Sequence, residues 1–141
     1  MDTPQKKIHI LIIDDDETMR RLYGSLLGLA GYEVLYAENG LLGREAARRL
    51  HPDLILLDLS MPGEDGYQTA KRILKEPNSP ASDIPIALLS NADLPIEAQQ
   101  WMKEIGIVDY IHKGINNEEF IARVKNILKQ AQEKSPQEPK L

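Results

Sequence analysis

The sequence predicts an α/β protein in which five helices cover a doubly wound sheet of five parallel strands. Four short runs are apolar almost throughout, as in strands buried on both faces, and a fifth short run is also strand-like. Segments with helical features alternate with these runs, and the connections are short. Because crossovers between parallel strands are right-handed, the helices should cover both faces. The five runs are residues 8–13, 33–37, 54–58, 86–90 and 108–112.

Start and stop signals mark the predicted helices. In the first helix apolar residues recur at helical spacing from Met19 and Leu22 onward, and Gly31 follows as a C-terminal stop. Either Asn116 or Asn117 can cap the last helix. The predicted helices span residues 18–30, 41–50, 67–75, 95–105 and 118–132.

Length and composition indicate one domain. The chain has 141 residues, which is an ordinary single-domain length. We assign residues 1–6 to an N-terminal lead and residues 7–132 to the domain. Residues 133–141 are mostly polar and contain two prolines, and we expect a disordered tail there.

The charge and the cysteine count narrow the partners and the compartment. A net charge of −5 argues against nucleic acid or an anionic membrane as the main partner, because both attract clustered Lys and Arg. No apolar stretch approaches the roughly 20 residues of a membrane span. The chain has no cysteine, which excludes disulfides and thiol catalysis and is compatible with the cytoplasm.

Polar residues stand where four of the predicted strands end. Asp14 and Asp15 follow the first strand, Asp58 ends the third, Ser90 ends the fourth and Lys113 follows the fifth. The carboxyl ends of parallel strands meet at one edge of the sheet, where open α/β sheets build their sites. Three carboxylates, a hydroxyl and an ammonium at one edge suit a divalent cation and a phosphoryl group.

The acids after the first strand have a second interpretation, since residues 14–17 could simply cap the first helix. Three gathered carboxylates are costly, however. Two charges about 4 Å apart repel by about 4 kcal/mol at an effective dielectric constant of about 20. A cation must offset this repulsion, or one acid must hold a proton. Mg²⁺ fits best because it prefers oxygen ligands, whereas only three scattered histidines and no cysteine are present.

Asp58 is the natural nucleophile of this set, because a carboxylate can form an aspartyl phosphate. Lys113 would supply a positive charge and Ser90 a hydrogen bond to the transferring group. A lone serine or lysine at a strand end is usually a solvated surface residue. Their convergence on Asp58 is what favours a functional role.

These residues, in this order, resemble the receiver domain of two-component response regulators, with single-domain chemotaxis regulators among the more similar patterns. The resemblance covers residues 7–129, and the stretch from Asp58 through Met61-Pro62 to Asp65-Gly66 is its most specific part. The other matching segments are residues 12–21, 89–92 and 109–113.

The resemblance implies a flavodoxin-like strand order of 2-1-3-4-5 and a phosphorylation switch. It implies that Mg²⁺ is bound and that a histidine kinase or histidine phosphotransfer protein donates the phosphoryl group. It further implies that phosphorylation reshapes the surface of helix four, strand five and helix five, which binds a target protein. The implied roles are Asp58 as phosphoacceptor, Ser90 and Lys113 as phosphate contacts, Ser90 and Tyr110 as switch residues, and Asp14, Asp15, Asp58 and the Ser60 backbone carbonyl as metal ligands.

The chain departs from the family pattern at Gly114, at Asn91, and at Ser60 and Ala92, which are both small and bring no acid or amide to orient a hydrolytic water. Gly114 stands where the family usually has proline, often after a cis bond. A non-proline cis bond costs about 3–4 kcal/mol, so we predict a trans Lys113–Gly114 bond and a looser loop. Asn91 replaces a smaller residue and could narrow access to the phosphoryl group. Trp101 shares the spacing of apolar helix residues, and we expect it to pack in the interior.

The leading interpretation is a stand-alone signalling switch that is not an enzyme in its own right. A relay intermediate that passes the phosphoryl group to another histidine is a close variant. One alternative is a degenerate receiver that binds partners without phosphorylation. A less favoured alternative is an aspartyl-phosphate phosphatase, which typically needs a second acid two residues after the nucleophile, where this chain has Ser60.

Overall fold

Five parallel strands form one sheet in the order β2-β1-β3-β4-β5, as predicted. This computed structural model describes residues 6–76 and 81–134. The strands are β1 (His9–Ile13), β2 (Glu33–Ala37), β3 (Leu54–Asp58), β4 (Ile86–Ser90) and β5 (Asp109–His112). The helices are α1 (Glu17–Leu29), α2 (Gly40–Leu50), α3 (Gly66–Lys75), α4 (Ile96–Ile105) and α5 (Asn117–Lys134).

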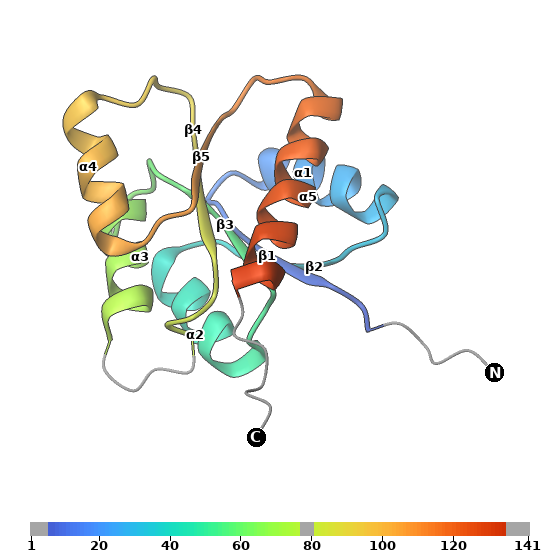
Figure 1. Ribbon diagram of the computed structural model, residues 1–141, viewed down its shortest axis with the longest axis horizontal. Helices are drawn as coiled ribbons and strands as arrows, with labels where there is room; N and C mark the ends of the chain where they lie inside the picture. Colours follow the sequence, from blue (N-terminus) through green and yellow to red (C-terminus); the bar gives the residue numbers. More distant parts are fainter. Residues whose placement is uncertain (1–5, 77–80, 135–141) are drawn as a thin grey trace.

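Helices cover both faces of the sheet (Figure 1). Two apolar layers lie between the sheet and the helices, and alternate residues of each central strand enter opposite layers. Leu11 of β1 and Leu57 of β3 face the layer covered by α2, α3 and α4. Ile10 and Leu56 face the layer covered by α1 and α5. Each residue of β3 and β4 is buried, which explains their apolar sequences.

The helices begin and end within two residues of the predicted bounds, and their caps explain the boundaries. The side chain of Asn116 accepts a hydrogen bond from the Glu119 amide at 2.8 Å. Asn116, and not Asn117, therefore caps α5. This helix continues to Lys134, so the prediction of disorder from residue 133 was wrong for its first two residues. The rest of that predicted tail, residues 135–141, lies outside the described residues.

Trp101 of α4 packs against Tyr67 of α3, with ring centroids 4.2 Å apart and an edge-to-face angle of 79°. It also contacts the apolar layer beneath α4, which confirms the predicted packing role. No helix within the described ranges combines the length and apolar character that a membrane span needs.

Candidate functional site at the carboxyl edge of the sheet

Strand register brings the polar strand ends together. Ile13 of β1 pairs with Leu57 of β3, so the next residues, Asp14 and Asp58, lie at matching positions on adjacent strands. Carboxylate oxygens of Asp14, Asp15 and Asp58 all lie within 4.8 Å of one another. Asp14 and Asp58 are buried, whereas Asp15 is exposed.

Lys113, which follows the edge strand β5, completes this cluster. Its Nζ lies 3.0 Å from Asp14 Oδ2 and 3.0 Å from Asp58 Oδ1. The Lys113 amide donates to the Ser90 carbonyl at 2.7 Å, which fixes the start of the side chain. The ammonium therefore offsets part of the repulsion between the two buried carboxylates.

Gly114 does not displace this lysine. Every peptide bond among the described residues is trans, including the predicted Lys113–Gly114 bond. The φ angle of Gly114 is 139°, a conformation that favours glycine and that the ring of proline forbids. The chain thus places the lysine with a backbone that differs from a proline turn. The looser loop stays a prediction.

The local electrostatics act in opposite directions on the two partners. Burial, together with the nearby charge of Asp14, raises the pKa of Asp58 to about 6. The hydrogen bond from Lys113 acts against this rise. Burial alone would lower the pKa of Lys113, but its hydrogen bonds to Asp58 and Asp14 outweigh burial and raise it. Lys113 therefore stays charged at neutral pH, whereas Asp58 gains or loses its proton at about pH 6.

Asp16 resolves the two interpretations of the first acidic segment. Its side chain accepts hydrogen bonds from the Thr18 and Met19 amides, at 2.8 and 3.4 Å, and so caps α1. Asp14 and Asp15 are therefore not needed for capping. Arg20, which sequence reasoning overlooked, donates to the Asp14 carbonyl at 2.7 Å and braces that backbone. Only its place one helical turn after the acids could have suggested this contact.

Ser90 and Tyr110 belong to a neighbouring hydrogen-bonded path. Ser90 is buried, and its hydroxyl accepts a hydrogen bond from the Ala92 amide at 3.1 Å. The Tyr110 hydroxyl donates to the Ala92 carbonyl. Tyr110 is half-buried and reaches the β4–α4 loop rather than the carboxylates. Arg123 of α5 supports its backbone, donating to the Tyr110 carbonyl at 2.9 Å.

Ser60 and Asn91 lie at the exposed rim. The Ser60 amide lies 3.5 Å from Asp58 Oδ1, at the limit of a hydrogen bond. Both side chains are exposed. The effect of Asn91 on access to the site stays a prediction.

Comparison with known proteins agrees with this fold. A family model described as the response regulator receiver domain matches residues 10–125, so the chain belongs to this family. Protein PilH of Pseudomonas aeruginosa is 33% identical over 119 residues, covering 84% of this chain and 96% of PilH. A putative response regulator from Chloroflexus aurantiacus shares 35% identity, with a TM-score of 0.77 over 88% of this chain and 99% of that one.

Other relatives are longer than this chain. A probable transcriptional regulator, ycf27 of Porphyridium aerugineum, is 35% identical over 130 residues. The match covers 92% of this chain but 52% of that protein. The chain thus spans about half the length of several curated relatives that it matches.

Receiver domains generally bind Mg²⁺ at an acidic pocket, and the residues present fit such a site. The candidate donors are three carboxylates close enough to share one ion, and Mg²⁺ prefers oxygen ligands. Lys113 contacts two of these carboxylates and places a positive charge beside them.

Proposed function

We propose that Asp58 accepts a phosphoryl group from the phosphohistidine of a histidine kinase or histidine phosphotransfer protein, in a Mg²⁺-dependent reaction. The observation that carries the proposal is the contact of Lys113 with both Asp14 and Asp58 beside the carboxylate cluster. The chain would be a switch that assists its own phosphorylation rather than an enzyme acting on a separate substrate.

In the transfer, a carboxylate oxygen of Asp58 attacks phosphorus while the phosphorus–nitrogen bond of the donor breaks. The electron pair of that bond goes to the donor imidazole nitrogen. The Lys113 ammonium would donate to a phosphoryl oxygen and stabilise its charge. The Ser90 hydroxyl would donate a second hydrogen bond.

Metal binding would use ligands that lie around the same carboxylate. Asp14, Asp15, Asp58 and the backbone carbonyl of Ser60 would hold the ion. When bound, Mg²⁺ supplies positive charge to the transferring oxygens.

The path through Ala92 supports a switch mechanism. When the Ser90 hydroxyl turns toward a phosphoryl oxygen, the Ala92 amide loses its present acceptor. The same residue holds the Tyr110 hydroxyl through its carbonyl. The β4–α4 loop and Tyr110 would then shift together, which is a two-state equilibrium biased by one new contact.

The proposed target surface consists of α4, β5 and α5, and α1 would receive the phosphodonor. Ile96 at the start of α4 is 80% exposed, and Val108 before β5 is 44% exposed. Leu22 on α1 is 46% exposed. We place this signalling in the cytoplasm, in keeping with a chain without cysteine.

We further propose that the receiver acts without an attached output domain. The likeness to PilH, which this chain covers almost completely, supports that arrangement. The mass of the protein isolated from its native cells tests it, and a product much larger than 15.9 kDa would contradict it.

The phosphoacceptor proposal is tested by intact-mass measurement after incubation with Mg²⁺ and acetyl phosphate. We expect one phosphoryl adduct that is stable to acid, labile to base, absent from Asp58→Asn and retained in Asp93→Asn. Asp93 is an exposed acid and serves as the control. No adduct in the wild type would favour the degenerate receiver, and steady turnover without an adduct would favour an enzyme.

A further inference from the structure

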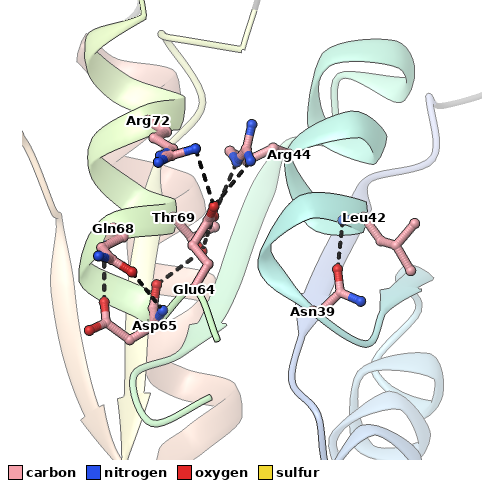
Figure 2. Close-up of polar contacts among 8 residues, drawn as sticks. All are labelled: Asn39, Leu42, Arg44, Glu64, Asp65, Gln68, Thr69 and Arg72. Carbon is pink, nitrogen blue, oxygen red and sulfur yellow. Dashed lines mark hydrogen bonds and ion pairs between the residues drawn. The ribbon is translucent and has the colours of Figure 1, made fainter. Parts of the chain in front are cut away.

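Glu64 in the β3–α3 loop is a half-buried hub that joins three elements (Figure 2). Its carboxylate accepts hydrogen bonds from Arg44 Nε and an Arg44 terminal nitrogen, at 3.1 and 3.0 Å. The Thr69 hydroxyl of α3 donates to it at 2.7 Å, and Arg72 lies 3.5 Å away. The Glu64 side chain is 18% exposed.

The charge of this carboxylate is compensated within the protein. Burial alone would raise the pKa of Glu64, but hydrogen bonds from Arg44 and Thr69 outweigh burial and lower it. Glu64 is therefore ionised at neutral pH. Two-pronged arginine–carboxylate pairs of this kind fix geometry as well as charge.

The start of α2 fits closely over this hub. Asn39 caps α2 by accepting a hydrogen bond from the Leu42 amide at 2.8 Å (Figure 2). A Cβ atom on the next residue, Gly40, would lie 2.5 Å from Glu64 Oε2 and 2.3 Å from Thr69 Oγ1. Only a residue without a side chain allows α2 to approach the carboxylate this closely.

Glu64 fastens the end of a loop that begins at the phosphoacceptor. The Leu59 amide donates to the Leu89 carbonyl at 3.0 Å, and the Gly66 amide donates to the Leu59 carbonyl at 3.0 Å. Ser60 lies between these backbone contacts and Glu64. The loop is therefore held at its base by the sheet and at its far side by α2 and α3.

We infer that Glu64 is a positioning residue for metal binding, because it holds the loop whose Ser60 carbonyl would ligate Mg²⁺. This inference rests on the proposed function. Groups that hold a metal ligand in place commonly change metal affinity when they are replaced, although they do not touch the ion. Glu64 itself would make no contact with Mg²⁺ or the phosphoryl group.

Calorimetric titration of the metal-free protein with Mg²⁺ tests the inference. We expect Glu64→Ala to raise the Kd for Mg²⁺ about tenfold, and Glu64→Gln to raise it less, because Gln can still accept from Thr69. Glu17→Gln is the matched control, since its ion pair with Arg21 at 3.0 Å is exposed. An unchanged Kd in both Glu64 variants would overturn the inference.

Two further readouts separate positioning from general destabilisation. Without Mg²⁺, amide hydrogen exchange in Glu64→Gln should speed up in residues 60–66 and stay unchanged in β3. With acetyl phosphate, the half-saturating Mg²⁺ concentration should rise while the maximal rate is retained. A lowered maximal rate with unchanged Mg²⁺ dependence would contradict positioning.

The two proposals fail differently. If the wild type binds Mg²⁺ but forms no adduct, the phosphoacceptor proposal fails and the titration still decides the role of Glu64. If Glu64→Ala does not fold, Glu64→Gln and Arg44→Gln carry the comparison. We expect both of these to weaken Mg²⁺ binding in the same direction.

Discussion

Two loops leave the carboxyl edge of the sheet beside the site, and they are held very differently. The β3–α3 loop is fastened by Glu64, and Asp65 and Gln68 form a reciprocal capping box at the start of α3 (Figure 2). The β4–α4 loop leads to Pro95, where α4 begins without a side-chain cap. Four of its five residues, 91–95, are exposed.

This contrast matches the different tasks proposed for the two loops. A loop that carries a metal ligand gains from being fixed before binding, since no ordering free energy is then lost. A loop that rearranges on phosphorylation must come from a weakly held part of the fold. The β4–α4 loop meets that requirement, because its described side-chain hydrogen bonds run through Ala92 to Ser90 and Tyr110.

The largest expected effect comes from disturbing the base of the fixed loop. A Cβ atom at Gly66 would lie 2.4 Å from the Asp58 carbonyl oxygen and 2.7 Å from Leu59 Cα. We expect Gly66→Ala to lower the free energy of unfolding by about 3 kcal/mol, as measured by urea denaturation. In the control Gly28→Ala, the added Cβ meets nothing within 4 Å. That change in the last turn of α1 should stabilise by up to about 0.5–1 kcal/mol, and equal losses in both variants would contradict the steric argument.

A second test concerns the cost of keeping the carboxyl group of Asp58 in this buried environment. The folded-state pKa of Asp58 is about 6, above its ordinary value of 3.8, so the folded protein holds this proton more tightly. The resulting stabilisation is complete below 3.8 and is lost as the pH rises through about 6. Asp58→Asn should remove this loss and raise the metal-free unfolding free energy at neutral pH by about 1–2 kcal/mol. The whole rise in the pKa of Asp58 would correspond to a larger gain in stability, but the substitution also removes one of the two carboxylate partners of Lys113.

This pH dependence is measured by urea unfolding in the presence of a chelator. The difference between Asp58→Asn and the wild type should grow between pH 3.8 and about 6 and then level off. A difference that stays constant with pH would contradict the raised pKa.

A third test compares one acid from each loop. Asp65→Ala removes the α3 cap, which accepts from the Gln68 amide at 2.9 Å, and should cost about 1 kcal/mol. Asp93→Ala in the β4–α4 loop removes a side chain with no hydrogen bond or ion pair to any described residue. Its effect should stay within about 0.5 kcal/mol. Thermal and urea denaturation would show whether the two loops differ in this way.

The smallest effect on stability is expected at the hydrogen bond that joins Tyr110 of β5 to the β4–α4 loop. Tyr110→Phe removes the hydroxyl that donates to the Ala92 carbonyl and should cost about 0.5 kcal/mol. Amide exchange near Ala92 should nevertheless speed up clearly, because few other described hydrogen bonds hold this part of the loop. Unchanged exchange there would contradict the weak anchoring of the β4–α4 loop.

Much of the fold follows from local pattern. The apolar runs of β3 and β4 predict strands buried on both faces, because no other short element accommodates four consecutive apolar residues without exposing some of them. Caps such as Asn39 mark helix starts, since their side chains bond amides three residues away. The C-terminal end of α5 was missed by two residues, because a polar segment without packing carries little signal there.

The candidate site was also largely predictable, because parallel strands bring their carboxyl ends to one edge. The sequence did not predict which of the neighbouring acids caps α1 and which lie beside Asp58. Asp14, Asp15 and Asp16 have the same side chain. Only the position at which α1 begins makes Asp16 the cap and leaves the other two beside Asp58. The backbone angle of Gly114, which keeps Lys113 in place without a proline, likewise depends on how β5 ends.

By itself the sequence determined the layers and the set of residues at the sheet edge, because strand and helix periodicity act over a few residues. The strand order was implied by the resemblance to receiver domains. Tertiary structure alone decided that Glu64 would be held between Arg44 and Thr69. Arg44 is 20 positions away, and the contact exists only because α2 approaches α3 closely at Gly40. A pairing between distant charges depends on the packing of whole helices, which local periodicity does not encode.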